Sequence, residues 1–178
     1  LKIKGVYTRK EYRRQYPEGE AVAQVVGLTN IDQFGREGIE RVYNDTLAGR
    51  PGSRRVIKDR LGRVIEDSDI VEPQEGQDVH LSIDGRMQFM AYQKLRDAVL
   101  LHKAASGSIV MLDGQTGEVL AMANYPSYDP NVRTNIDPVR TRNSSVMDMY
   151  EPGSSLKPIT VALALSENVV KPETVFNT

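Results

Sequence analysis

Two apolar runs around a short glycine-containing loop constrain the fold of this chain most strongly. Residues 108–112 and 118–123 are built from Ser, Ile, Val, Met, Leu, Glu and Ala, and Asp113-Gly114-Gln115-Thr116-Gly117 separates them. A five-residue loop with two glycines favours antiparallel pairing of its flanks. The sequence therefore predicts a β-hairpin over 108–123.

A helix is predicted before this hairpin. Asp84 can cap its first turn, and apolar residues then recur at three- and four-residue spacing to about Lys103. The predicted inner face comprises Met87, Met90, Ala91, Lys94, Leu95, Ala98 and Leu101. We interpret the methionines as core residues. The alternating run 79–83 is predicted to be a strand that leads into the helix.

The first 80 residues are irregular and rich in Arg, Gly and Pro. The apolar run 21–28 is either a short strand or a buried helical turn, and its length does not decide between them. Apolar spacings of three and four residues predict a short amphipathic helix within 38–47. Gly49-Arg50-Pro51-Gly52 then ends that helix.

A second hairpin is predicted from the segments that follow. Residues 53–58 and 64–66 flank the loop 59–63, which has a glycine near its end. Residues 66–78 contain six acidic residues, a proline and a glycine, so we predict a linker there.

Composition excludes several classes of function. The chain has no cysteine, which excludes disulfides, thiolate catalysis and sulfur-ligated metals. Its 23 basic and 24 acidic residues give a net charge of −1, so no electrostatic argument favours a nucleic-acid partner. His80 and His102 stand far apart without acidic partners at ligand spacing, and we interpret both as structural or surface residues. No metal or organic cofactor is predicted.

Both ends of the sequence resemble the edges of a fragment. The chain starts at Leu1 without a methionine, ends at Thr178 without a polar tail, and contains no signal peptide. It also lacks a run of 18 apolar residues, the length needed for a membrane span.

The strongest chemical signal is Ser154-Ser155-Leu156-Lys157, an S-x-x-K motif. Residues three apart share one side of a helix, so the Lys157 amine can reach the Ser154 hydroxyl. A serine hydroxyl becomes a useful nucleophile when a neighbour accepts its proton. We therefore predict Ser154 as the nucleophile and Lys157 as its general base. The alternative reading of the motif alone is a helix cap followed by an exposed lysine.

The residues that flank the motif favour the catalytic reading. Pro158 has no N–H to donate to the Ser154 carbonyl, so the helical ladder is interrupted at the candidate nucleophile. The apolar run 159–165 predicts that a helix over 154–170 is largely buried and holds Ser154 rigidly.

Three blocks together resemble class B penicillin-binding proteins, the monofunctional peptidoglycan transpeptidases. Residues 150–158 (YEPGSSLKP) resemble their acylation signature, and 106–131 resemble the opening hairpin of their catalytic domain. Gly35-Arg36-Glu37-Gly38-Ile39-Glu40 and residues 47–52 are similar to their N-terminal pedestal module. The resemblance implies an α+β fold: an irregular pedestal segment with short strands and a helix, followed by an incomplete transpeptidase domain of antiparallel sheet and packed helices.

The resemblance also implies a division into modules. Residues 1–78 correspond to the C-terminal part of the pedestal (dimerisation-type) module with its linker, and 79–178 to the N-terminal part of the transpeptidase domain. The family completes its site with S-x-N and K-T-G motifs, and K-T-G is absent here. Ser166-Glu167-Asn168 spells S-x-N, but we reject it because it lies only nine residues after Lys157 in the same predicted helix. The chain is therefore expected to be inactive alone.

Within the class, 1–5 and 58–66 look most similar to the cell-division (septal) transpeptidase of Gram-negative bacteria. That likeness implies cross-linking of peptidoglycan stem peptides ending in D-Ala-D-Ala, inhibition by β-lactams, and contact with division membrane proteins that include a lipid II polymerase. It further implies the periplasmic face of the inner membrane, with an N-terminal transmembrane anchor absent from this chain. The alternatives are an elongation-specific transpeptidase, a non-catalytic pedestal that contacts division proteins, and a serine β-lactamase or β-lactam sensor.

Overall fold

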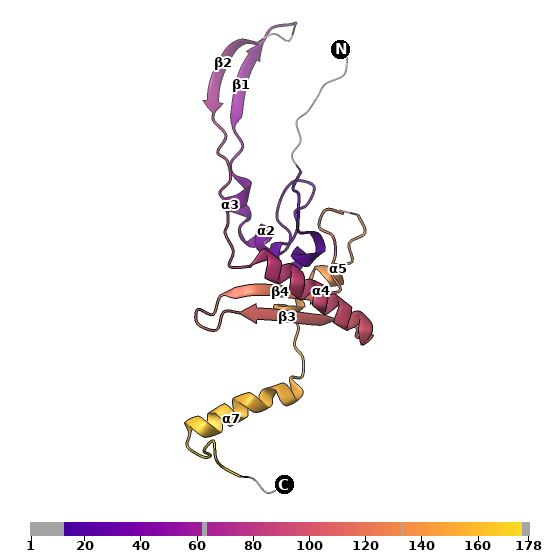
Figure 1. Ribbon diagram of the computed structural model, residues 1–178. Helices are drawn as coiled ribbons and strands as arrows, with labels where there is room; N and C mark the ends of the chain where they lie inside the picture. The colour runs from indigo at the N-terminus through magenta and orange to yellow at the C-terminus, as the bar shows by residue number, and fades with distance from the viewer. Residues whose placement is uncertain (1–12, 62–63, 133, 176–178) are drawn as a thin grey trace. The chain divides into compact units, whose positions relative to one another are not determined.

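The computed structural model describes residues 13–61, 64–132 and 134–175 (Figure 1). The chain divides into two compact units, Leu1–Met147 and Asp148–Thr178. These units are defined by contacts within this chain. The predicted division into family modules over 1–78 and 79–178 is a separate matter and stays a prediction.

Short helical turns, rather than strands, make up the first described segment. The run 21–28, for which the sequence left two possibilities, is helical, and the predicted single helix over 38–47 is two short helices that meet at Tyr43. The bounds are η1 Gly19–Ala21, α1 Ala23–Val26, α2 Gly38–Val42 and α3 Asn44–Ala48.

Gly38 shows why the pedestal-like motif needs glycine. Its φ is +58°, and a Cβ at this position would lie 2.5 Å from the Val25 carbonyl oxygen. Other residues rarely adopt this backbone conformation, and the close approach leaves no room for a side chain. Gly38 thereby lets α2 start directly against the end of α1.

The first predicted hairpin is confirmed, with a longer second strand than expected. β1 (Ser53–Lys58) pairs antiparallel with β2 (Val64–Val71). The linker predicted over 66–78 is therefore wrong for 66–71, which form ladder hydrogen bonds with β1. Acidic composition suggested a linker, but a strand requires only that its backbone groups find partners.

The predicted helix before the second hairpin is confirmed as α4 (Gly85–Leu101). Asp84 caps it, because its carboxylate accepts hydrogen bonds of 2.9 Å from the N–H groups of Arg86 and Met87. The predicted inner face holds only for Ala91 and Leu95. Met87 and Met90 are 39% and 59% exposed rather than core residues. Lys94, Ala98 and Leu101 are exposed as well. The buried residues are Gln88, Ala91, Tyr92, Leu95 and Val99.

The second hairpin is also confirmed. β3 (Gly107–Leu112) and β4 (Val119–Tyr125) pair antiparallel. At the turn, the Asp113 carboxylate accepts hydrogen bonds of 2.8 Å from the N–H groups of Gln115 and Thr116. The Thr116 and Gln115 N–H groups lower the pKa of Asp113, in that order of effect. The loop thus carries its own local stabilisation.

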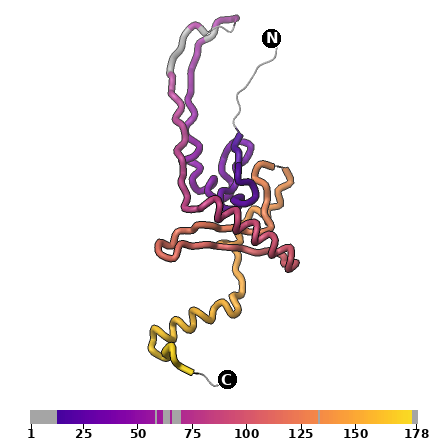
Figure 2. The backbone as a smooth tube through the Cα atoms, viewed as in Figure 1, coloured from indigo at the N-terminus to yellow at the C-terminus, as the bar shows by residue number. Residues whose placement is uncertain are grey.

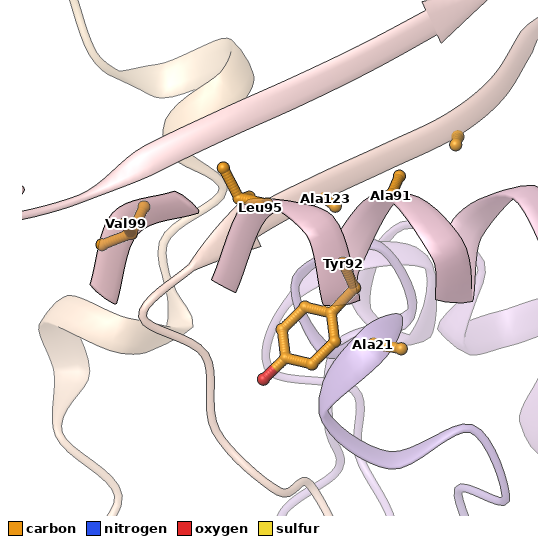
Figure 3. Packing of buried hydrophobic residues seen from close by; sticks show 7 residues of the cluster. Ala21, Ala91, Tyr92, Leu95, Val99 and Ala123 are labelled. Carbon is orange, nitrogen blue, oxygen red and sulfur yellow. The ribbon is translucent and has the colours of Figure 1, made fainter. Parts of the chain in front are cut away.

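The main core lies where α4 crosses the β3–β4 hairpin. Figure 3 shows Ala91, Tyr92, Leu95 and Val99 along the helix, with Ala21 on the N-terminal segment below it. Ala121 and Ala123 complete the cluster from β4 at 0% and 1% exposure. Small residues on the strand let the helix approach closely, which suits dense packing.

The predicted strand 79–83 is wrong, because these residues form no backbone ladder with β4. The Gln88 side chain is fully buried, accepts from Met122 N–H at 2.7 Å and donates to the Met122 carbonyl at 2.9 Å. It also donates to the Ala21 carbonyl. This amide therefore joins α4 to β4 at Met122. Residues 79–84 lie instead at the start of β4. Those residues reach β4 only through Ser82 Oγ, which donates to Val119, and Asp84 N–H, which donates to Leu120.

Hydrogen bonds join the N-terminal segment around 16–23 to the loop around 128–131 that follows β4. The two segments run side by side in Figure 2. Asn131 pairs with the Tyr16 backbone, accepting from its N–H at 3.0 Å and donating to its carbonyl at 2.9 Å. The buried Tyr128 hydroxyl donates to the Ala23 carbonyl at 3.0 Å. Two short helices, α5 (Pro138–Thr141) and α6 (Ser144–Met147), follow later in this segment.

Candidate acylation site

Ser154 lies in a 3₁₀ turn, η2 (Gly153–Leu156), that continues directly into α7 (Lys157–Ser166). Both elements belong to the unit Asp148–Thr178. The predicted helix over 154–170 is thus confirmed in outline, but its first turn is tighter than an α-helical one and it ends four residues earlier.

Pro158 explains the tight first turn. In an α-helix the Ser154 carbonyl would accept from residue 158, which as a proline has no N–H. The Lys157 N–H donates to the Ser154 carbonyl instead. This i to i+3 hydrogen bond defines 3₁₀ geometry, so the residue after the S-x-x-K motif shapes the turn that carries the serine.

The 3₁₀ turn favours an encounter between the two predicted site residues. Side chains at i and i+3 eclipse one another at three residues per turn, which places Ser154 and Lys157 on the same side. Both residues are exposed. Over the described ranges, no hydrogen bond joins the Ser154 hydroxyl to the Lys157 amine. The turn therefore directs the side chains of Ser154 and Lys157 to the same side.

Gly153 sets the entry into this turn. Its φ is +53°, in the left-handed region that residues with a Cβ enter at a cost of roughly 1–2 kcal/mol. A Cβ at this position would meet no atom within 4 Å. Backbone conformation, and not crowding, is therefore the reason that glycine precedes the serine.

The structure agrees with rejection of the S-x-N match. Ser166 is the last residue of α7, and its hydroxyl donates to the Leu163 carbonyl at 2.8 Å. At 1.5 Å of rise per residue, Ser166 lies roughly 14 Å along the helix from Lys157. Asn168 follows with φ +56° and donates its N–H to Leu165. These residues end the helix and do not face the Ser154 turn.

The prediction that the motif helix is buried is wrong for this chain. No residue of η2 or α7 is buried, and Ile159 and Leu163 are 65% and 60% exposed. Apolar residues on one broad face predicted burial, but that face is exposed in the unit Asp148–Thr178. The described residues of Asp148–Thr178 do not contain a second element large enough to cover it.

Asn124 is a functional candidate that the sequence reading missed. It lies in β4 and is 3% exposed. Its Oδ1 accepts from the N–H and hydroxyl of Ser145 at 2.9 and 2.8 Å, and from the Ser108 hydroxyl at 2.9 Å. Its Nδ2 donates to Asn143 Oδ1 at 2.9 Å. The available signal was an amide directly after the small apolar residues of the predicted strand 118–123.

The two histidines interpreted as structural or surface residues, His80 and His102, are both exposed. Within residues 13–61, 64–132 and 134–175, no group of three or more His, Asp or Glu side chains lies close enough to hold a metal ion. In the same part of the chain, no helix combines the length and apolar character needed to cross a membrane.

Comparisons with known proteins define the class. Residues 107–178 match the family described as the penicillin binding protein transpeptidase domain, and residues 1–81 match the penicillin-binding protein dimerisation domain. Together with the fold and the S-x-x-K turn, these matches show that the chain belongs to the class B penicillin-binding proteins. The resemblance read from the three sequence blocks is confirmed.

Two relatives are named as peptidoglycan D,D-transpeptidases. The chain is 47% identical over 178 residues to the peptidoglycan D,D-transpeptidase FtsI of Escherichia coli K12, covering 100% of this chain and 30% of that protein. It is 44% identical over 168 residues to the probable peptidoglycan D,D-transpeptidase PenA of Neisseria gonorrhoeae, covering 93% of this chain and 29% of that protein.

A solved structure supports the fold. Penicillin binding protein 3 of Mycobacterium tuberculosis matches with a TM-score of 0.78 and 32% identity, over 92% of this chain and 34% of that one. The predicted mixed helix-and-strand fold with small antiparallel sheets is therefore confirmed. The chain spans about a third of the length of the relatives that it matches.

Proposed function

We propose that this chain is part of a septal peptidoglycan D,D-transpeptidase and carries its acylating serine, Ser154. One observation carries the proposal: the S-x-x-K motif lies on a 3₁₀ turn that directs Ser154 and Lys157 to the same side. Identity of 47% to a protein named as such a transpeptidase supports both the reaction class and the septal role.

In the proposed acylation, Ser154 Oγ attacks the carbonyl carbon of the penultimate D-Ala in a stem peptide. Lys157 Nζ accepts the hydroxyl proton as the C–O bond forms. The C–N bond to the terminal D-Ala then breaks, and the proton returns to the leaving amine. This step produces an ester between the stem peptide and Ser154.

In the proposed second step, an amine from a neighbouring stem peptide attacks the ester carbonyl. The new C–N bond forms the cross-link, the C–O bond to Ser154 breaks, and the proton that the attacking amine loses returns to the Ser154 oxygen. A β-lactam resembles the D-Ala-D-Ala terminus and acylates the same serine, but its opened ring remains attached and blocks the second step. The reaction requires no metal or organic cofactor.

The proposal includes a place and a set of partners. We place the full-length protein at the periplasmic face of the inner membrane, anchored by a transmembrane segment outside these 178 residues. Its partners there would be the stem peptides, β-lactams and membrane proteins of cell division, among them a lipid II polymerase. Names of the relatives support this setting, as do the matches to both family domains.

A fluorescent penicillin added to the full-length protein tests the nucleophile. We expect stable covalent labelling of the wild type, loss of labelling in Ser154→Ala, and retained labelling in Ser155→Ala, a control in the same exposed turn. Equal labelling of Ser154→Ala would contradict the assignment. Fast release of hydrolysed penicillin would indicate a β-lactamase instead.

The septal role has its own test. Depletion of the protein should reduce incorporation of a fluorescent D-amino acid at the division site and leave the side wall labelled. Loss of side-wall labelling with a normal septum would favour the elongation-specific alternative.

A further inference from the structure

The Ser154 carbonyl is the point at which two different turns could form. An α-helix would pair this carbonyl with the N–H of residue 158, whereas a 3₁₀ turn pairs it with the N–H of residue 157. The structure has the second arrangement, since the Lys157 N–H donates to the Ser154 carbonyl. Two residues earlier the Ser155 N–H donates to the Pro152 carbonyl at 3.1 Å, which is the same i to i+3 pattern. Pro158 has no N–H, so the α-helical alternative lacks its donor.

The two turns place the side chains of Ser154 and Lys157 differently. In 3₁₀ geometry three residues complete one turn, so the two side chains eclipse one another at a rise of roughly 6 Å. In α-helical geometry three residues cover roughly 300°, so the side chains are offset by roughly 60° at a rise of roughly 4.5 Å. The rise alone thus differs by more than about 1 Å, and a misplacement of about 1 Å can slow a reaction about 10²-fold.

We propose that Pro158 is a positioning residue for acylation, because it withholds the N–H that would convert the turn at Ser154 to α-helical geometry. This inference rests on the proposed roles of Ser154 and Lys157. In the proposal Pro158 contacts neither the substrate nor the transferred proton, and it acts through the placement of the serine hydroxyl relative to the lysine amine. All three residues lie in η2 or at the start of α7, within one compact unit.

Single-turnover acylation of the full-length protein by a fluorescent penicillin tests this proposal. Three quantities are needed: the rate constant at saturating penicillin, the apparent dissociation constant, and the final number of labels per protein. For Pro158→Ala we expect the rate constant to fall at least about tenfold, with an unchanged dissociation constant and close to one label per molecule. A merely structural role would lower the final labelling and leave the rate constant unchanged, and that result would overturn the inference.

Two further variants separate the restored N–H from the loss of a proline ring. Pro152→Ala is the matched control at the other end of η2, and it should acylate at the wild-type rate because an N–H at residue 152 does not face the Ser154 carbonyl in a helical turn. N-methylalanine at position 158, introduced by cell-free synthesis, opens the ring but still lacks the N–H, so it should recover the rate. Equal slowing of all three variants would contradict the proposal.

Coupling between Pro158 and Lys157 provides a readout that a loss of stability would not change. If Pro158 acts by placing the lysine amine, the effects of the two substitutions are not additive. We expect Pro158→Ala to slow the Lys157→Ala protein no further. Independent effects that multiply in the double variant would contradict the proposal.

A wild-type rate constant in Pro158→Ala would overturn the inference and leave Ser154 as the proposed nucleophile. Where that variant does not fold, Pro158→Ser restores the same N–H, and a wild-type rate there would overturn the inference too. Failure of the wild type to acylate, or acylation of Ser154→Ala, would instead overturn the proposed function, and this inference with it. A slow Pro158→Ala together with a normal Pro152→Ala supports the inference.

Discussion

Of the two compact units of this chain, one contains the packed core and the other contains the S-x-x-K motif. In Leu1–Met147, α4 packs on the β3–β4 hairpin around Leu95, which is 6% exposed. In Asp148–Thr178, which carries the S-x-x-K motif, no residue of η2 or α7 is buried and Leu163 is 60% exposed. Substitutions in the first unit should therefore change stability, and those in the second should change acylation.

The largest expected effect is on acylation. Lys157→Ala removes the proposed base, and a positioned base contributes about 10²–10⁴-fold to a proton-transfer step. We expect the acylation rate of the full-length protein to fall by at least about 10²-fold with unchanged thermal stability, because Lys157 is exposed in this chain. Lys171→Ala, at another exposed lysine of the same unit, should acylate normally. A Lys157→Ala rate within twofold of wild type would exclude this role.

The same substitution in the two units gives the sharpest contrast in stability. Leu95→Ala removes buried methyl groups and should lower the free energy of unfolding by about 2–5 kcal/mol. Leu163→Ala in the same 178-residue chain should change it by less than about 0.5 kcal/mol. Denaturant unfolding of both variants measures the difference. Equal losses would show that α7 is packed in this chain and would break the comparison.

Polar packing in the first unit should also matter. Gln88→Leu leaves the Met122 N–H and carbonyl and the Ala21 carbonyl without their partner. A buried polar group left unpaired costs about 1–3 kcal/mol, so we expect a loss of at least that size. The control is Gln93→Leu on the exposed side of α4, which should stay within about 0.5 kcal/mol of wild type. Similar stabilities of the two variants would contradict the role of Gln88.

The smallest expected effect concerns alkaline pH. Burial raises the pKa of Tyr92 and of Tyr128 above the usual value, and the hydrogen bond to Glu20 adds to the rise at Tyr92. Unfolded tyrosines ionise near pH 10, so the stability that these phenols contribute is present below pH 10 and is lost as the pH rises toward their folded pKa values. The free energy of unfolding should fall by about 1 kcal/mol per tyrosine between pH 9 and 11. Tyr128→Phe should show a smaller fall, and an unchanged slope would contradict this.

Local signals in the sequence predicted the helices and turns better than they predicted which side chains are buried. The Asp84 cap and the Asp113–Gly117 loop depend on neighbouring residues, and both were confirmed by the hydrogen bonds that define them. The inner face of α4 was misplaced because its most buried member is a polar residue, Gln88. The alternating run 79–83 is not a strand, since the segment before α4 meets β4 through the Ser82 hydroxyl and the Asp84 N–H and not through a ladder. Long-range hydrogen bonds of this kind leave no periodic pattern in a sequence.

At the candidate site, too, local features could be predicted from the sequence and long-range contacts could not. The S-x-x-K motif and Pro158 were readable directly, and the 3₁₀ turn is the structural consequence of that proline. Asn124 was not found, because its partners Ser108, Asn143 and Ser145 come together only when the hairpin and α6 are folded. Apolar residues predicted a buried α7, and this was wrong, because burial depends on elements that lie far from α7 in the sequence.

Mapping the covalent adduct on the full-length protein tests the central claim most directly. After reaction with a penicillin, mass spectrometry of proteolytic peptides should find the added mass on a peptide that contains 150–158, with fragment ions that assign it to Ser154. The account predicts one adduct per molecule at that residue and none in Ser154→Ala. An adduct on Ser155 or on any peptide outside this segment, with Ser154 unmodified, would contradict it.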